Sequence, residues 1–278
     1  MLATFVTDIL RLLVWLVLLV LVFGLAERWW PRRAARLWRP GMLQDLAYYF
    51  ASGFVPKLLL ALPLSALAWL LHHTVPSAYY AWVAEWPLWL RLPLALVVAD
   101  FGAYWGHRLA HRVPFLWRFH AVHHSPEHID WLVNTRAHPF DLAFNRLCAL
   151  VPTYVLGLSQ PAAGGLDLAP LLVLVIGNAW GFFVHANVRW RFGWLEHCLS
   201  TPAFHHWHHA HGDVRLFDKN FASMLPWMDR LFGTLHLPPR DWPERYGSDT
   251  PVSPTLAGQL IDPLRPLVAD KRLVERLR

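Results

Sequence analysis

Residues 88–111 read LWLRLPLALVVADFGAYWGHRLAH and combine an apolar run with a histidine motif. Residues 88–105 are mostly apolar, as expected of a membrane span, and the stretch then ends in the motif His107-Arg-Leu-Ala-His111. Two histidines four residues apart lie one turn apart on the same face of a helix. Because the neutral imidazole is the commonest metal ligand in proteins, the stretch predicts a membrane helix that carries two metal ligands at its end.

Two further histidine clusters follow the same spacing. Residues 120–124 read HAVHH and residues 205–209 read HHWHH, and fourteen of the seventeen histidines fall between His107 and His211. The HxxHH spacing places two imidazoles on one helix face and a third beside them. Three such clusters offer more ligands than one ion accepts, so they predict two neighbouring metal ions. The candidate ligands are His107, His111, His120, His123, His124, His205, His208 and His209, with His185 at the end of another apolar stretch as a ninth.

The composition indicates an integral membrane protein. The chain of 278 residues is 55% hydrophobic and only 16% charged, below the roughly 25% of an ordinary soluble domain. Its 17 tryptophans suit membrane interfaces. The net charge of +6 does not indicate nucleic-acid binding, because the arginines border apolar segments. The cysteines Cys148 and Cys198 form no CxxC motif, which argues against a zinc ribbon or a redox dithiol.

Five apolar stretches predict about four to five spans. They are Leu10–Ala26, Leu46–Leu71, Leu88–Trp105, Leu142–Leu158 and Leu166–Val184. The second contains Pro56 and Pro63, so it is either one kinked span or two shorter pieces. The last two are short and form either a hairpin of two spans or a re-entrant pair.

The predicted fold is therefore an all-α integral membrane bundle with a cytoplasmic, histidine-rich helical cap. We divide it into an N-terminal transmembrane region (1–87), a histidine-box domain (88–238) and a C-terminal cytoplasmic tail (239–278).

Charge bias orients this bundle in the inner or cell membrane. The first span is followed by a run of arginines, whereas the connections 73–87 and 159–165 contain neither Lys nor Arg. By the positive-inside rule, the arginine-rich side is cytoplasmic and the N-terminus lies outside. All three clusters and His185 then meet at the cytoplasmic side, which supports one shared site.

Ligand type alone does not name the metal, since imidazole suits zinc, copper, iron and nickel. A structural zinc needs only four ligands, the zinc-hydrolase motif HExxH is absent, and no carboxylate lies within the clusters. Ligating imidazoles usually donate their second N–H to an acceptor, for which Asp100, Asp218 and Asp229 are candidates. The complete set of residues predicted to support or line the site is Asp100, His138, Asn187, His206, Asp218, Asn220 and Asp229.

These motifs resemble the fatty acid hydroxylase and sterol desaturase superfamily. The similar segments lie between about residues 90 and 238 and are DFGAYWGHR (100–108), HAN (185–187), TPAFHHWHH (201–209), DKNF (218–221) and WMDRLFGT (227–234). The resemblance implies a di-iron centre held by the eight clustered histidines and His185. It also implies O₂ as co-substrate and a C–H bond of a lipid as the target. Because no fused electron-transfer domain is recognisable, we expect electrons from a separate protein.

The expected reaction is hydroxylation rather than desaturation of a fatty acyl chain or sterol-like lipid, which reaches the metals from the bilayer. Two other classes stay open at this point. One is a membrane metal transporter or metal-binding protein, although a transporter would more often place its ligands near the bilayer midplane. The other is a zinc-dependent membrane hydrolase, which would require fewer ligands and a general base.

Overall fold

The computed structural model describes residues 2–34, 38–159 and 168–265, and these residues form helices and loops without a β-strand. The long helices are α1 (Leu2–Leu19), α3 (Met42–Thr74), α5 (Leu88–Arg112), α7 (Pro139–Val155) and α8 (Leu168–His185). The shorter α-helices are α2 (Leu25–Trp29), α4 (Ser77–Ala84), α6 (Pro114–His124), α9 (Pro202–His208), α10 (Trp227–Leu231) and α11 (Leu256–Ile261). Single turns of other types are η1 (Val20–Gly24), η2 (Trp131–Thr135), η3 (Gly193–His197), η4 (Val214–Leu216) and η5 (Asp262–Leu264).

Four helical segments among the described residues are long and apolar enough to cross a membrane. They are Thr4–Trp29, Met42–Thr74, Leu88–Arg112 and Leu168–His185. The prediction of an all-α membrane bundle is confirmed, and the proline-containing second stretch is one continuous helix, α3. The fourth predicted stretch is α7, whose 17 residues fall short of the roughly 20 that a span needs. The predicted connection 159–165 lies outside the described residues from position 160 onward.

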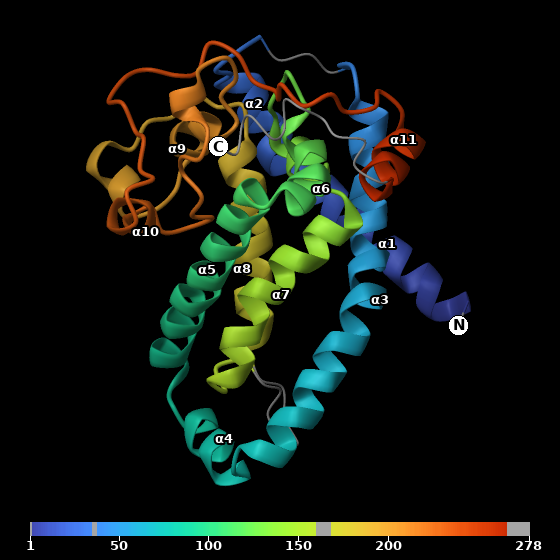
Figure 1. The fold of residues 1–278 in the computed structure, drawn as a ribbon, viewed down its shortest axis with the longest axis vertical. Helices are drawn as coiled ribbons and strands as arrows, with labels where there is room; N and C mark the ends of the chain where they lie inside the picture. The colour runs from blue at the N-terminus through green and yellow to red at the C-terminus, as the bar shows by residue number, and fades with distance from the viewer. Residues whose placement is uncertain (1, 35–37, 160–167, 266–278) are drawn as a thin grey trace.

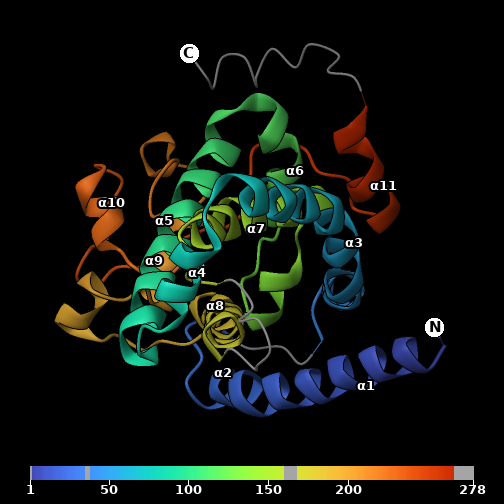
Figure 2. The ribbon, with the colours of Figure 1, turned by 90° about the horizontal axis from the view of Figure 1, so that it is seen from below.

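The bundle has a histidine-bearing end and an opposite end. Figure 1 shows α5 and α8 running to the same end, where α2, α6 and α9 gather, while α4 lies at the other end. Seen from that other end, α7 lies between α5 and α3, and α1 lies along the outside next to α8 (Figure 2). The ends of α5 and α8 therefore deliver their terminal histidines to one cap.

Two helices of the cap begin with a proline, after an abrupt change in chain direction. Val113 separates α5 from α6 with an extended backbone, and Pro114 occupies the first turn of α6, where a proline is tolerated. Pro202 does the same for α9, and the Thr201 hydroxyl accepts a hydrogen bond from the Phe204 amide at 3.4 Å. These abrupt turns bring α6 back beside the end of α5.

Small residues allow α5 and α7 to pack closely. A Cβ atom at Gly102 would lie 2.0 Å from the Cys148 carbonyl oxygen, and one at Gly106 would lie 2.7 Å from the Cys148 Cβ. Only glycine fits at such distances, as in other helix pairs that pack within membranes. This contact fixes the middle of α7 beside the C-terminal half of α5.

Buried charges tie the N-terminal region to the cap. A Glu27 carboxylate oxygen accepts hydrogen bonds from the Trp131 and Asn187 amides, both at 2.8 Å. Arg39 pairs with Asp45 at 2.7 Å and also with Asp130. Buried carboxylates with several hydrogen-bond partners rigidify their surroundings, so the N-terminal helices hold the loops beside His123 and His185 in place.

Candidate metal centre

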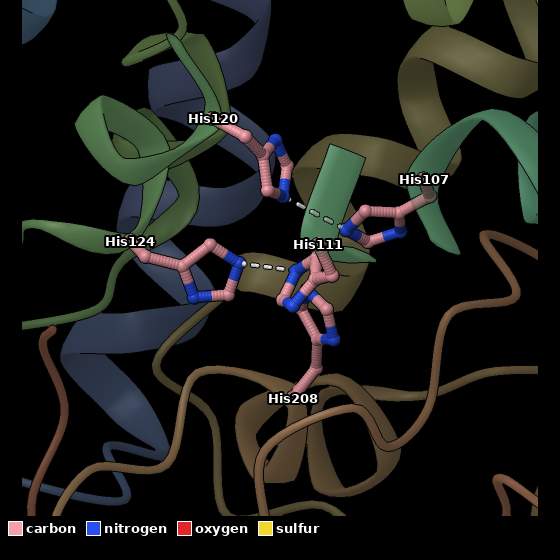
Figure 3. A group of neighbouring side chains, drawn as sticks. All are labelled: His107, His111, His120, His124 and His208. Atoms are coloured by element: carbon pink, nitrogen blue, oxygen red, sulfur yellow. Dashed lines mark hydrogen bonds between the residues drawn. The ribbon is translucent and has the colours of Figure 1, made fainter. Parts of the chain in front are cut away.

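The structure gathers nine histidines into two buried groups. The first group contains His107, His111, His120, His124 and His208, and the second contains His123, His185, His205 and His209. Within each group, one ring nitrogen per residue lies within 4.8 Å of the others. Figure 3 shows the rings of the first group converging from separate segments of the chain. These nine histidines are the nine candidate ligands predicted from the sequence, eight from the motifs and His185 from its place at the end of an apolar stretch.

Each HxxHH motif contributes candidate ligands to both groups. In α6, His120 and His124 join the first group, while the intervening His123 joins the second. In the α9 motif, the assignment is reversed: His205 and His209 join the second group and His208 joins the first. The i, i+4 pair therefore serves one group and the i+3 residue serves the other, so each motif links both groups.

The pairing of His107 with His120 suits a cation held between their ring nitrogens. Nδ1 of His107 lies 2.9 Å from the Phe221 carbonyl oxygen, and Nδ1 of His120 lies 3.0 Å from an Asp141 carboxylate oxygen. Both Nδ1 atoms must donate to these acceptors, which leaves a lone pair on each neutral Nε2. Nevertheless, the two Nε2 atoms are only 3.1 Å apart. Two lone pairs at this distance repel unless a proton or a metal ion lies between them.

The second group contains an equivalent pair. Nδ1 of His123 lies 3.0 Å from the Arg136 carbonyl oxygen, Nδ1 of His185 lies 2.7 Å from the Gly181 carbonyl oxygen, and their Nε2 atoms are 3.3 Å apart. Burial, reinforced by neighbouring imidazoles, lowers the pKa of His123 well below its ordinary value. The same causes lower the pKa of four other candidate ligands, His124, His205, His208 and His209. Protonation is therefore disfavoured, and the neutral imidazoles are suited to hold a metal ion.

The remaining distances suit ions bound by imidazole. The Nε2 atoms of His111 and His124 are 3.2 Å apart, and the Nε2 of His205 lies 3.1 Å from that of His185 and 3.1 Å from that of His209. Two nitrogens that each bind one ion at about 2.1 Å, with tetrahedral or octahedral angles, lie about 3.0–3.4 Å apart. The Nε2 atom of His208 is buried without a hydrogen-bond partner, as expected of a metal ligand.

Asp141 is a supporting residue that sequence reasoning missed. It is buried in the first turn of α7 and accepts from His120 while also accepting from the Asn145 side-chain amide at 2.9 Å. The sequence offered one signal for it, a carboxylate two residues after Pro139 at the start of an apolar stretch. Of the predicted carboxylates, Asp218 makes a direct contact, because it lies 3.6 Å from the Nδ1 of His111 and pairs with Arg112 at 2.8 Å.

The other predicted carboxylates act through the loop after His209. Two carbonyl groups of this loop, from Lys219 and Phe221, accept from His208 at 2.8 Å and His107 at 2.9 Å. Asp229 accepts from the Phe221 amide at 2.8 Å and the Ala222 amide at 2.9 Å.

The same loop is fixed at two more points. Asp100 accepts from three successive amides, those of Ser223, Met224 and Leu225, at 2.8 to 3.1 Å. The Asn220 amide donates to the Phe204 carbonyl at 2.8 Å and to the His236 carbonyl at 2.7 Å. Burial raises the pKa of Asp229, although the hydrogen bonds that its carboxylate accepts from Thr234, Ala222 and Phe221 oppose the rise. Asp100, Asn220 and Asp229 thus hold the loop that orients two candidate ligands.

Three of the residues predicted to support or line the site contact neither group directly through a hydrogen bond to a candidate ligand's ring. They are His138, Asn187 and His206. His206 is fully buried with Nδ1 2.8 Å from the Tyr246 hydroxyl, and burial lowers its pKa to about 3 while burial raises that of Tyr246 to about 12. His138 caps α7, accepting from the Phe140 amide at 3.1 Å, and its Nε2 lies 3.1 Å from the Leu260 carbonyl oxygen. The Asn187 side chain bonds the backbone of Arg33 at 2.9 and 3.0 Å. Each connects the cap to another part of the chain.

Comparisons with known proteins cover the segment that contains both histidine groups. The profile of the fatty acid hydroxylase family matches residues 92–234, which contain all nine histidines. An ornithine lipid hydroxylase from Rhizobium tropici is 36% identical over 187 residues, which are 66% of this chain and 53% of that protein. An alkylglycerol monooxygenase from Danio rerio is 30% identical over 55% of this chain and 31% of its own length.

A third relative has a different named reaction. A Δ7-sterol 5(6)-desaturase from Gibberella zeae is 26% identical over 61% of this chain and 47% of its own length. The chain thus spans about half or less of the curated relatives that it matches. No solved structure matches significantly.

Proposed function

Because this chain belongs to the fatty acid hydroxylase family, we propose that it is a membrane-bound, non-haem di-iron oxidoreductase that uses O₂ to hydroxylate a C–H bond of a membrane lipid. The observation that carries the proposal is the pair of buried imidazole groups at the ends of α5 and α8. Electrons for the reaction come from a separate protein. The nine histidines are the proposed ligands, five for one iron and four for the other.

The donor set fits two iron ions. Neutral imidazoles are suitable iron ligands, and the Nδ1 acceptors described above leave the Nε2 lone pairs directed into each group. When bound, iron supplies the redox chemistry that activates O₂. The separation into two groups, bridged by the motifs of α6 and α9, keeps two ions close together.

The protein contributes orientation and a dry environment. Oxygen acceptors fix the tautomers of several imidazoles and so preorganise the ligands. They are the backbone carbonyls of Phe221 and Arg136 and the carboxylate of Asp141. Eight of the nine rings belong to buried residues and His107 is part-buried, so the site excludes most water. Exclusion of water limits side reactions of reactive oxygen species at such a site.

The location of the centre supports a lipid substrate. Candidate ligands terminate two of the four apolar helices, so an acyl chain or sterol-like molecule can approach without leaving the bilayer. The named relatives act on an ornithine lipid, an alkylglycerol and a sterol, according to their names. We propose hydroxylation over desaturation, because the two more similar relatives named above are a hydroxylase and a monooxygenase.

Charge bias further supports a cytoplasmic orientation. Arg33 and Arg39, which follow the first span, lie at the same end of the bundle as the histidine groups, because Arg33 contacts Asn187 and Arg39 pairs with Asp130. We therefore propose that the centre lies on the cytoplasmic side of the inner or cell membrane, where a separate electron donor reaches it.

Metal analysis tests this function against transport and zinc hydrolysis. The protein is purified in detergent from cells grown with iron and zinc, and both metals are counted per chain before and after dialysis. We expect two iron ions per chain that survive dialysis, together with O₂ consumption when a reductant and lipid are supplied. One exchangeable ion, or stoichiometric zinc with no O₂ consumption after iron loading, would reject the proposed oxygenase.

A further inference from the structure

Two short helices of the cap expose large apolar side chains beside the spans. In η3, Trp194 is 72% exposed and Leu195 is 42% exposed; in α10, Leu231 is 67% exposed and Trp227 is 41% exposed. The opposite faces of the same turns are buried, as shown by Glu196 in η3 and by Met228 and Asp229 in α10. Each turn is therefore two-faced, with an apolar face turned away from the protein.

Both turns lie alongside membrane-spanning residues rather than above them. Phe232, which follows α10, packs on α5 with ring centroids 5.0 Å from Trp105, 5.2 Å from Tyr104 and 6.4 Å from Phe101. Phe192, which precedes η3, lies 6.2 Å from Phe183 of α8. Figure 1 accordingly shows α10 beside the upper part of α5, below the level of α9.

The exposed apolar face continues the lipid-facing surface of α5. Phe101 is 45% exposed and Trp105 is 37% exposed, and both belong to the span Leu88–Arg112. The Arg230 guanidinium donates to His197 at 3.2 Å, so α10 and η3 form one connected unit. A soluble surface rarely carries so large an apolar patch, whereas tryptophan, leucine and arginine together are typical of a bilayer interface.

We propose that η3 and α10 form a shelf that is inserted in the bilayer leaflet on the histidine side, with Trp194, Leu195, Trp227 and Leu231 at the boundary between headgroups and acyl chains. Arg230 lies at headgroup level. Since Asp229 of α10 holds the loop that orients His107 and His208, insertion of the shelf fixes the depth of the metal centre relative to the lipid.

Spin-label accessibility tests the shelf directly. In a Cys148→Ala, Cys198→Ser background, a nitroxide is attached to Trp194→Cys or Leu231→Cys, and the full-length protein is placed in phosphatidylcholine/phosphatidylglycerol nanodiscs. Leu62→Cys, at an 80% exposed position of α3, serves as the lipid-facing control, and Arg240→Cys, on an exposed loop, serves as the aqueous control. All four positions are exposed, so labelling them preserves the fold.

We expect the labels at 194 and 231 to collide more with O₂ and less with a water-soluble nickel chelate than the label at 240, as the label at 62 does. If the ratio of O₂ collisions to nickel-chelate collisions at 194 and 231 equals the ratio at 240, the shelf lies in water. Protection from both reagents would place it under another protein. Either result would overturn the proposal, whatever reaction the metal centre performs.

Discussion

The Asp141 carboxylate lies 3.0 Å from the Nδ1 atom of His120, and both residues are buried. This contact fixes which nitrogen of His120 carries the proton and directs its Nε2 toward His107. The orientation of one proposed iron ligand therefore depends on a carboxylate that contributes no ligand atom itself.

We expect Asp141→Ala to reduce metal affinity or activity by about 10–100-fold, as for other carboxylates behind a metal-bound histidine. Asp141→Asn should fall between this variant and the unmodified protein, because the amide oxygen can still accept from His120. Iron titration of the purified variants measures the effect. The matched control is Asp249→Asn, because Asp249 is an exposed carboxylate that pairs with His211, a histidine of neither group. Equal affinity in Asp141→Ala and Asp249→Asn would show that Asp141 does not position the ligand.

Loss of one proposed ligand from each group should have similar consequences. His208→Ala removes an imidazole from the first group and His123→Ala removes one from the second. We expect each variant to insert in the membrane but to lose turnover and part of its bound iron. His236→Ala is the control, because His236 belongs to neither group and its ring packs on Trp207, with centroids 4.7 Å apart. Full turnover by His208→Ala or His123→Ala would remove that residue from the ligand set.

The metal-free protein should lose stability as the pH falls. Burial lowers the folded-state pKa of His123, His205 and His209 below the ordinary value of 6.5. The unfolded chain then binds more protons than the folded chain once the pH drops below about 6.5, so protonation favours unfolding. Thermal unfolding of iron-free protein in detergent should show a lower Tm at pH 5 than at pH 7.5. Bound iron should reduce this difference at moderately acid pH, and an apo-protein Tm that does not fall would contradict the expected burial.

Cysteine labelling measures the proposed orientation. Glu85→Cys reports on the end of the bundle near α4, and Arg215→Cys reports on the histidine-bearing end; both positions are exposed. In a background without native cysteines, an impermeant maleimide added to intact cells should label position 85 and spare position 215. Labelling of position 215 alone would place the metal centre, and hence its electron donor, outside the cytoplasm.

The sequence was most informative where the chemistry depends on local spacing. The i, i+3, i+4 spacing identified eight of the nine histidines that the fold brings together, because neighbouring turns of one helix share a face. The ninth, His185, was predicted from its place at the end of an apolar stretch. It could not assign His120 and His123 to different groups, since that division depends on how α5, α8 and α9 approach α6. For the same reason it missed Asp141 and Glu27, whose roles come from contacts with His120 and with the Trp131 and Asn187 amides.

Long-range packing also determines how each predicted supporting residue acts on the site. Asp218 contacts the ring of His111, but Asp100 binds backbone amides of the loop that carries Phe221, and His138 caps α7. A polar residue near a histidine motif in the sequence can thus support the site through the backbone. Only the folded chain distinguishes that role from direct contact with an imidazole.

The most direct test of the central proposal is the fate of labelled oxygen. Purified, iron-loaded protein is supplied with ¹⁸O₂, an electron donor and a membrane lipid extract, and the lipids are analysed by mass spectrometry, with His208→Ala as the control. We expect ¹⁸O in a new lipid hydroxyl group with the unmodified protein and none with the variant. A new double bond without label would indicate desaturation instead. No O₂ consumption with any lipid, despite full iron loading and a working donor, would contradict the assignment as a lipid oxygenase.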